Sequence, residues 1–203
     1  SGQTVRLDTL VDGRRPIILT PVYYSCPLLC NVTLNRMVDT LRELPWTVGA
    51  DYRIVTFSID PREKSELAQK KRAGYLEQLG QKDVGDGWHF LTGSGPAIRK
   101  LTDMLGFGYR YDDEKMEYLH RAALIILTPD GTVERYLHGS YVPPVQMKLA
   151  LLKAAGGQLG STKQRLWAML FRYDAERRQY RFNPVIPGVG VLVLVSSLVG
   201  ITL

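Results

Sequence analysis

Both cysteines of the chain lie in one short segment, Tyr23-Tyr24-Ser25-Cys26-Pro27-Leu28-Leu29-Cys30. An apolar, β-branched run from Pro16 to Tyr24 leads into it, and a helical pattern continues from it to about Leu44. This order predicts a buried strand, interrupted by Pro21, that turns directly into a helix. Cysteines four residues apart lie on one face of a helix, so both sulfurs should converge on its first turn.

The position of the two cysteines limits their chemistry. A helix N-terminus presents unpaired N–H groups and a partial positive charge, which should lower the pKa of the thiols of Cys26 and Cys30. Two thiolates at such a turn can close a disulfide or hold a soft metal ion. The alternative is that both cysteines are buried as small apolar side chains. We interpret the pair as the functional site because it is the chain's only pair and stands at a helix start.

The rest of the chain has the composition of a globular protein. It has 203 residues, of which 45% are hydrophobic and 23% charged, and its length suits one domain with appendages. Strands are predicted at residues 17–24, 52–59 and 88–91, with a hairpin at 122–128 and 132–137. Helices are predicted at 28–44, 65–79, 94–105 and 145–155. Strands and helices alternate before the hairpin, so we expect an α/β fold with a mixed sheet and helices on both faces.

The C-terminal part differs from the rest in charge and hydrophobicity. The net charge of +6 is concentrated between residues 163 and 181, where basic side chains interleave with aromatic and aliphatic ones. Val185 to Leu203 then carries no charge, which at about 1.5 Å per residue is long enough to span a bilayer. A buried core helix is the alternative. We therefore predict a domain at 1–158, a basic amphipathic juxtamembrane segment at 159–183 and a transmembrane helix at 184–203.

A basic cluster beside an apolar tail is better explained by lipid headgroups than by nucleic acid. No zinc-finger spacing or RNA-binding signature is present, so nucleic acid is not an expected partner. The chain starts with Ser1-Gly2, which predicts that an N-terminal piece has been removed.

Four motifs follow one another in an order that resembles the Sco (SenC) family from about Gly2 to Ala155. They are Cys26-Pro27-Leu28-Leu29-Cys30, Ser58-Ile59-Asp60-Pro61, Trp88-His89-Phe90-Leu91-Thr92-Gly93 and Leu119-His120. Members of this family are membrane-anchored, thioredoxin-like copper proteins that assist assembly of the binuclear copper centre of cytochrome c oxidase. The resemblance implies a thioredoxin-like fold, and it implies that Cys26, Cys30 and His120 are copper ligands.

The chain departs from the family pattern at two places. Many members have proline directly after the second cysteine, where this chain has Asn31, and Pro27 follows the first cysteine instead. Proline is well tolerated in the first turn of a helix, so the loop should still form. The apolar anchor is C-terminal here, whereas familiar members carry it at the N-terminus.

Three further residues could support the metal site or have only a structural role. His89 has apolar neighbours in a short strand, which favours packing. His138 ends the hairpin strand and is interpreted as a structural residue, with a weak secondary ligand as the alternative. Asp60 ends a strand at the sheet edge where ligand sites of α/β proteins gather, so it either caps the next turn or tunes the site.

The leading functional hypothesis is a membrane-anchored copper chaperone for a haem-copper oxidase. Thiolates favour Cu(I), and an added imidazole also accommodates Cu(II). One alternative is a thiol-disulfide oxidoreductase that uses Cys26 and Cys30 as a redox-active pair to reduce the oxidase's copper-ligand cysteines. Another is a resident accessory subunit of a respiratory complex. The expected partners are oxidase subunit II or another respiratory complex, thiol reductants and the lipid bilayer.

The location of the soluble domain follows from the resemblance rather than from charge. Basic residues before the tail would place the domain in the cytoplasm by the positive-inside rule, but long domains translocate largely regardless of charge. We therefore expect the domain on the periplasmic side, or in the intermembrane space if the protein is mitochondrial.

Overall fold

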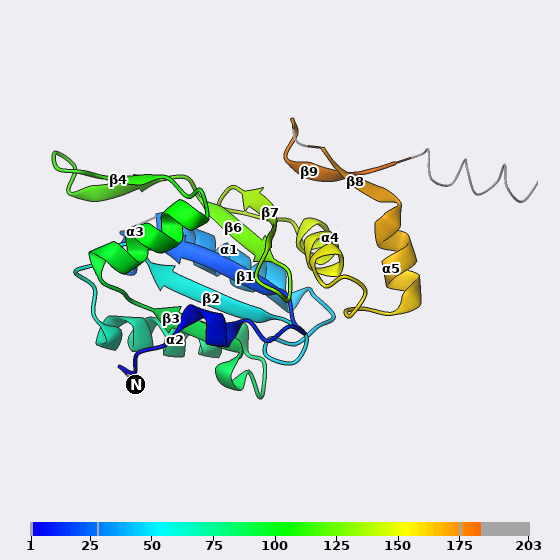
Figure 1. Ribbon diagram of the computed structural model, residues 1–203, viewed down its shortest axis with the longest axis horizontal. Coiled ribbons are helices and arrows are strands. Elements are labelled where there is room, and N and C mark those ends of the chain that lie inside the picture. The colour runs from blue at the N-terminus through cyan, green and yellow to red at the C-terminus, as the bar shows by residue number, and fades with distance from the viewer. Residues whose placement is uncertain (1, 28, 175, 184–203) are drawn as a thin grey trace, which may run out of the picture. The chain divides into compact units, whose positions relative to one another are not determined.

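The computed structural model describes residues 2–27, 29–174 and 176–183 (Figure 1). The chain forms two compact units, Ser1–Leu159 and Gly160–Leu203, which are described separately.

The first unit is built on a five-stranded mixed sheet in the order β3-β2-β1-β6-β7. Neighbouring strands β1, β2 and β3 are parallel, whereas β6 is antiparallel to both β1 and β7. The strands span Ile17–Val22 (β1), Arg53–Ser58 (β2), Trp88–Leu91 (β3), Ala123–Leu127 (β6) and Val133–His138 (β7). The predicted mixed sheet is therefore confirmed.

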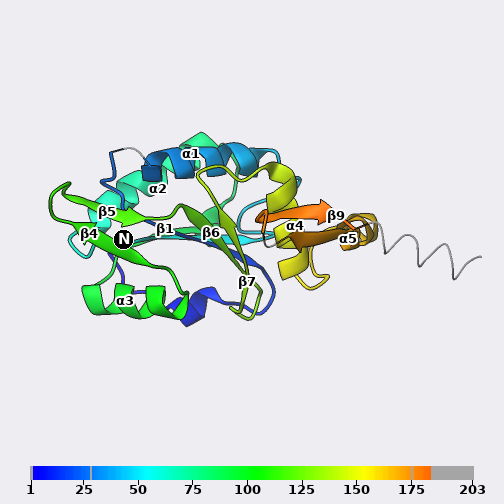
Figure 2. The ribbon, with the colours of Figure 1, turned by 90° about the horizontal axis from the view of Figure 1, so that it is seen from above.

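Helices cover both faces of this sheet. Figure 2 shows α1 and α2 on one face and α3 on the other, beside the 3-10 helix Leu7–Leu10. The helix bounds are Leu29–Arg42 (α1), Ser65–Leu79 (α2), Gly95–Met104 (α3) and Pro144–Ala154 (α4), with a short 3-10 helix at Gly85–Gly87. Val38 and Leu41 of α1 are completely buried, as are Ile54 of β2 and Ile125 of β6. Burial of such aliphatic side chains is the main force that holds helices to the sheet.

Pro21 does not interrupt its strand, contrary to expectation. β1 continues to Val22, and all six of its residues are buried. On one side β1 pairs with β2 along its whole length, but β6 pairs only with Ile17, Ile18 and Leu19. Because Pro21 lies beyond the end of that second pairing, its missing N–H costs no hydrogen bond to β6.

A hairpin that the sequence analysis missed carries one of the predicted ligands. Strands β4, Tyr109–Asp112, and β5, Glu117–His120, form a separate antiparallel pair. The pair extends from one end of the unit beside α3 (Figure 1). Both strands are only four residues long and rich in tyrosine and charged residues, so they lack the alternating apolar pattern that marks a strand.

The described part of the second unit forms one helix and one hairpin. Helix α5, Thr162–Met169, begins with a capping box between Ser161 and Gln164. The chain then forms a hairpin of β8, Phe171–Asp174, and β9, Gln179–Phe182. The predicted basic amphipathic segment, residues 159–183, thus contains a helix followed by a hairpin.

No helix among the described residues has both the length and the hydropathy needed to cross a membrane. The predicted transmembrane helix, residues 184–203, lies outside the described residues.

Candidate metal centre

The cysteines meet where β1 passes into α1. The N–H group of Cys30 donates a hydrogen bond to the Sγ atom of Cys26, with an N to S distance of 3.4 Å. The sulfur thereby satisfies one of the first N–H groups of α1, which have no partner within the helix. Both side chains are buried, and the two cysteines are not joined in a disulfide. The two cysteines lie close together, but Cys26 precedes α1 and is not on the helix's first turn as expected.

His120 reaches the same place from the end of β5. Its Nε2 atom lies 3.5 Å from the Sγ of Cys30, and its Nδ1 atom lies 3.2 Å from the carbonyl oxygen of Arg121. A carbonyl oxygen can only accept, so Nδ1 carries the proton and the Nε2 lone pair faces the sulfur. The rings of Phe107 and Tyr23 flank the imidazole, with centroids 5.8 and 6.2 Å away.

Burial controls the protonation of these donors in the metal-free chain. Desolvation raises the pKa of the Cys30 thiol to about 12, so the expectation of a lowered pKa is wrong for Cys30. Desolvation also lowers the pKa of His120, which keeps the imidazole neutral at pH 7. A metal ion that binds here finds a neutral imidazole but must displace the proton of Cys30.

The described residues do not form a closed metal cage. Among them, no group of three or more His, Cys, Asp or Glu side chains lies close enough together to hold a metal ion. Cys30 contacts His120, and Cys26 adjoins Cys30 through the backbone N–H. The three-ligand set therefore stays a prediction. Its two sulfurs and one imidazole nitrogen are a donor set that suits copper.

Asn31 compensates for the departure from the family pattern. Its Nδ2 atom donates to the carbonyl oxygen of Cys26 at 2.9 Å, and its Oδ1 atom accepts from the Nζ of Lys71 at 2.8 Å. A proline at this position would make neither bond. The cysteine loop is thus tied to both α1 and α2 through Asn31.

Glu63 is a residue of the site that the sequence analysis missed. It is buried just before α2, and its carboxylate accepts hydrogen bonds from the backbone N–H groups of Tyr24 and Ser25. An acidic residue before a helix is common because it complements the helix dipole, so its residue type did not distinguish Glu63. Its position shortly after the Asp60-Pro61 motif was the one signal in the sequence.

Asp60 lies at the same end of the sheet, where it pairs with Arg62. The guanidinium of Arg62 contacts the carboxylate of Asp60 at 2.8 Å, and the hydroxyl of Tyr118 donates to it at 3.4 Å. Burial by itself would raise the pKa of Asp60, but the hydrogen bonds and charge of Arg62 outweigh it and hold that pKa below its usual range. Asp60 therefore links the loop after β2 to strand β5, which carries His120.

A cluster of tyrosines lies between this ion pair and the cysteines. The ring of Tyr118 lies 5.4 Å from that of Tyr23 and 5.0 Å from that of Tyr111, and the Arg62 guanidinium stacks 4.8 Å above Tyr111. These contacts hold the β4–β5 hairpin against the cysteine loop.

His138 is exposed at the end of β7, where it pairs with Ala123. It lines the same surface cavity as His120, but its ring stacks on that of Tyr136. This contact agrees with the interpretation of His138 as a structural residue.

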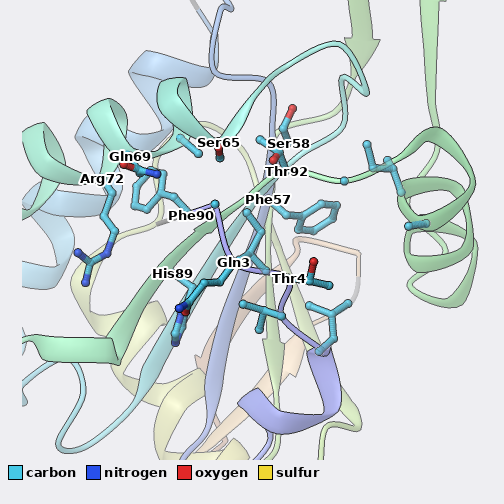
Figure 3. Close-up of a pocket in the computed structure, with 18 of the residues that line it drawn as sticks. Gln3, Thr4, Phe57, Ser58, Ser65, Gln69, Arg72, His89, Phe90 and Thr92 are labelled. Atoms are coloured by element: carbon cyan, nitrogen blue, oxygen red, sulfur yellow. The ribbon is translucent and has the colours of Figure 1, made fainter.

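His89 belongs to a different cavity. This cavity, of about 840 Å³, lies between α2, β3, α3 and the N-terminal segment (Figure 3). Figure 3 shows His89 beside Gln3, with Arg72 and Gln69 extending from α2. The volume would suit a small molecule, but Cys26, Cys30 and His120 do not line it.

Comparisons with known proteins identify the family of the chain. The sequence model of the SCO1/SenC family matches residues 2–155. No curated protein sequence is a significant match.

Among solved structures, a protein from Aquifex aeolicus VF5 is 24% identical with a TM-score of 0.61, over 70% of this chain and 79% of that one. BsSco, a member of the Sco family of cytochrome c oxidase assembly proteins, is 22% identical with a TM-score of 0.54. The match covers 73% of this chain and 82% of BsSco. Bradyrhizobium japonicum ScoI, solved with copper bound, is 20% identical with a TM-score of 0.49. The match covers 74% of this chain and 87% of that protein.

The first two likenesses show a shared thioredoxin-like fold. The family match covers all four sequence motifs and both segments that supply the site. The chain therefore belongs to the SCO1/SenC family.

Proposed function

We propose that this protein binds copper through Cys26, Cys30 and His120 and delivers it to the binuclear copper centre of a cytochrome c oxidase. The observation that carries the proposal is the 3.5 Å approach of the His120 Nε2 to the Cys30 sulfur, beside Cys26. Family membership supports the choice of metal, because Sco proteins are copper-binding proteins of oxidase assembly.

The donor chemistry fits a carrier of copper in both oxidation states. Two sulfurs favour Cu(I), and the imidazole adds the nitrogen donor that Cu(II) accepts. Copper is the cargo, and the chain supplies two thiols that lose their protons and an imidazole whose lone pair is already oriented. Oxidation of the cysteines to a disulfide would remove both thiolates, so loading requires the reduced pair and a thiol reductant to restore it.

The direct test is copper content after reduction and dialysis. Wild-type protein should retain one copper per chain, and the Cys26→Ser/Cys30→Ser double variant should retain none. His120→Ala should weaken binding, more for Cu(II) than for Cu(I), because Cu(II) depends more on the nitrogen donor. His138→Ala is the matched control, because this exposed histidine stacks on Tyr136. Undiminished copper in the double cysteine variant would refute the site.

The alternative is a thiol-disulfide oxidoreductase that acts on the oxidase's copper-ligand cysteines. The contact between His120 and Cys30 favours the carrier, because disulfide exchange requires only an attacking thiolate and a resolving partner. His120→Ala separates the two in cells grown over a range of copper supply. A carrier should lose oxidase activity at low copper, whereas normal activity at the lowest copper would favour the reductase.

We also propose that residues 184–203 anchor the chain in a membrane, with the copper domain on its periplasmic or intermembrane-space side. The adjoining hairpin supports contact with lipid, because its strands place aromatic residues on one face and Arg172 opposite Arg181 on the other. Like charges directly opposite one another are unfavourable. Asp174 offsets part of this repulsion, 3.7 Å from Arg181, and anionic headgroups would offset more of it.

The test of anchoring is extraction of membranes. The full chain should remain with membranes in a high-salt wash without detergent, and its release would contradict anchoring.

A further inference from the structure

The buried carboxylate of Glu63 accepts three hydrogen bonds from the cysteine loop. Oε1 of Glu63 accepts from the backbone N–H and the hydroxyl of Ser25, each at 2.7 Å. Oε2 accepts from the backbone N–H of Tyr24 at 2.8 Å and from the hydroxyl of Ser58 at 2.6 Å. A carboxylate offers about four acceptor sites, so these four bonds use its full capacity.

These hydrogen bonds connect three segments of the chain: the cysteine loop, the end of β2 and the segment just before α2. Tyr24 and Ser25 immediately precede Cys26, whereas Ser58 ends β2 and Glu63 precedes α2. Cys30 lies within α1, and its backbone N–H donates to the Sγ atom of Cys26. The placement of one sulfur relative to the other therefore depends on the conformation of residues 24–26, which Glu63 fixes to the loop after β2.

The cost of burying Glu63 is offset by its hydrogen bonds to the cysteine loop and Ser58. A buried carboxylate is costly unless its acceptors are satisfied, and a buried N–H without a partner is costly as well. Glu63 is only 8% exposed, so both costs are avoided only while the loop keeps this conformation. Charge-assisted bonds of this kind are short and roughly twice as strong as neutral ones.

We propose that Glu63 is a positioning residue that sets the separation of the Cys26 and Cys30 sulfurs, and with it the copper affinity and the dithiol–disulfide equilibrium of the pair. The copper part rests on the proposed function. The redox part does not, because it concerns only the two thiols.

The redox part can be written as a balanced exchange. The thiols of Cys26 and Cys30 react with glutathione disulfide to give one intramolecular disulfide and two glutathione thiols. Two electrons and two protons pass from the cysteine pair to glutathione. The equilibrium constant reports how effectively one cysteine thiol meets the other. A loosened loop lowers that effective concentration and shifts the equilibrium toward the dithiol.

The experiment compares Glu63→Gln with Glu66→Gln in the full chain in detergent. Both changes remove one negative charge, but Glu66 is exposed in the first turn of α2. The Glu63→Gln change keeps the size of the side chain and replaces one acceptor oxygen with an amide donor. The glutathione equilibrium constant should shift roughly tenfold toward the dithiol, equivalent to about 30 mV. Affinity for Cu(I), measured by competition with a chelator, should fall by roughly 10- to 100-fold.

Glu63→Asp retains the carboxylate and should restore part of both values, whereas Glu66→Gln should match wild type. The proposal is overturned if folded Glu63→Gln has the wild-type equilibrium constant and affinity, or if Glu66→Gln shifts them equally. Should Glu63→Gln fail to fold, Ser25→Ala removes one bond to Oε1 and must shift both values in the same direction by less. If wild type binds no copper but the glutathione equilibrium still shifts, the proposed function fails while the role of Glu63 stands.

Discussion

At the scale of single residues, burial shifts the pKa values of the side chains that form the site. The Cys30 thiol keeps its proton because burial raises its pKa, and the His120 imidazole stays neutral because burial lowers its pKa. The apo site is therefore uncharged at these two donors. Copper loading must release the proton of Cys30, so affinity should rise with pH.

His89 provides a pH test away from the copper ligands. Desolvation by burial lowers its pKa below the ordinary value of 6.5. The folded state therefore binds fewer protons than the unfolded state just below that pH, so stability is complete above about pH 6.5 and decreases as pH falls through the pKa of the folded state.

We expect the free energy of unfolding to fall less between about pH 7.5 and 5.5 in His89→Gln than in wild type. Urea unfolding at both pH values measures the difference, and carboxylates stay mostly ionised in this range. Equal pH dependence in the two proteins would contradict the assignment.

At the scale of elements, the sheet aligns the segments that carry the site. Thr20 of β1 lies opposite Thr56 of β2, and Phe90 of β3 lies beside Thr56 in turn. This register brings the ends of β1 and β2 together, so that the cysteine loop and the loop that carries Glu63 meet at one edge. Parallel strands place their carboxyl ends on the same side, which is where ligand sites of α/β proteins form.

The two opposed threonines offer a matched pair of substitutions. Both are completely buried, but Thr56 accepts a hydrogen bond from the indole nitrogen of Trp88 at 2.9 Å, whereas the hydroxyl of Thr20 contacts the sulfur of Met37 at 3.7 Å.

Thr56→Val should destabilise the fold by about 1–3 kcal/mol, because it leaves a buried N–H without its acceptor. Thr20→Val should have a much smaller effect, since a thioether is a weak acceptor. Urea denaturation of both variants measures the contrast, and equal losses would show that the Trp88 bond contributes little.

At the scale of the whole molecule, the candidate metal centre lies entirely in the first compact unit. Every residue of the candidate site falls between Tyr23 and His120, and this unit ends at Leu159. The second unit supplies the arginine-bearing hairpin and leads to the proposed anchor.

A chain of residues 1–159 should therefore fold alone, unfold cooperatively with a free energy of about 5–15 kcal/mol, and bind copper as the full chain does. Circular dichroism, urea unfolding and metal analysis measure these properties. A truncated chain that is insoluble or unfolded would show that the second unit is needed for folding.

Local features of the sequence were enough to predict the cysteine turn, most strands and helices, and the family. Cys26 and Cys30 lie four residues apart at a strand–helix junction, and this spacing was enough to predict that they lie close together. The short β4–β5 and β8–β9 hairpins were missed because their charged residues and tyrosines do not form an apolar alternation.

The family resemblance implied that His120 completes the cysteine pair, but only the tertiary structure showed the contacts around the pair. His120 reaches Cys30 across 90 residues of sequence, and Glu63 reaches Ser25 across 38. It also decided that the Cys30 thiol is protonated, because desolvation outweighs the helix N-terminus once the packed sheet and hairpin bury the sulfur. The physical reason is that periodicity and spacing act within a few residues, whereas burial and long-range contacts arise only when distant segments pack together.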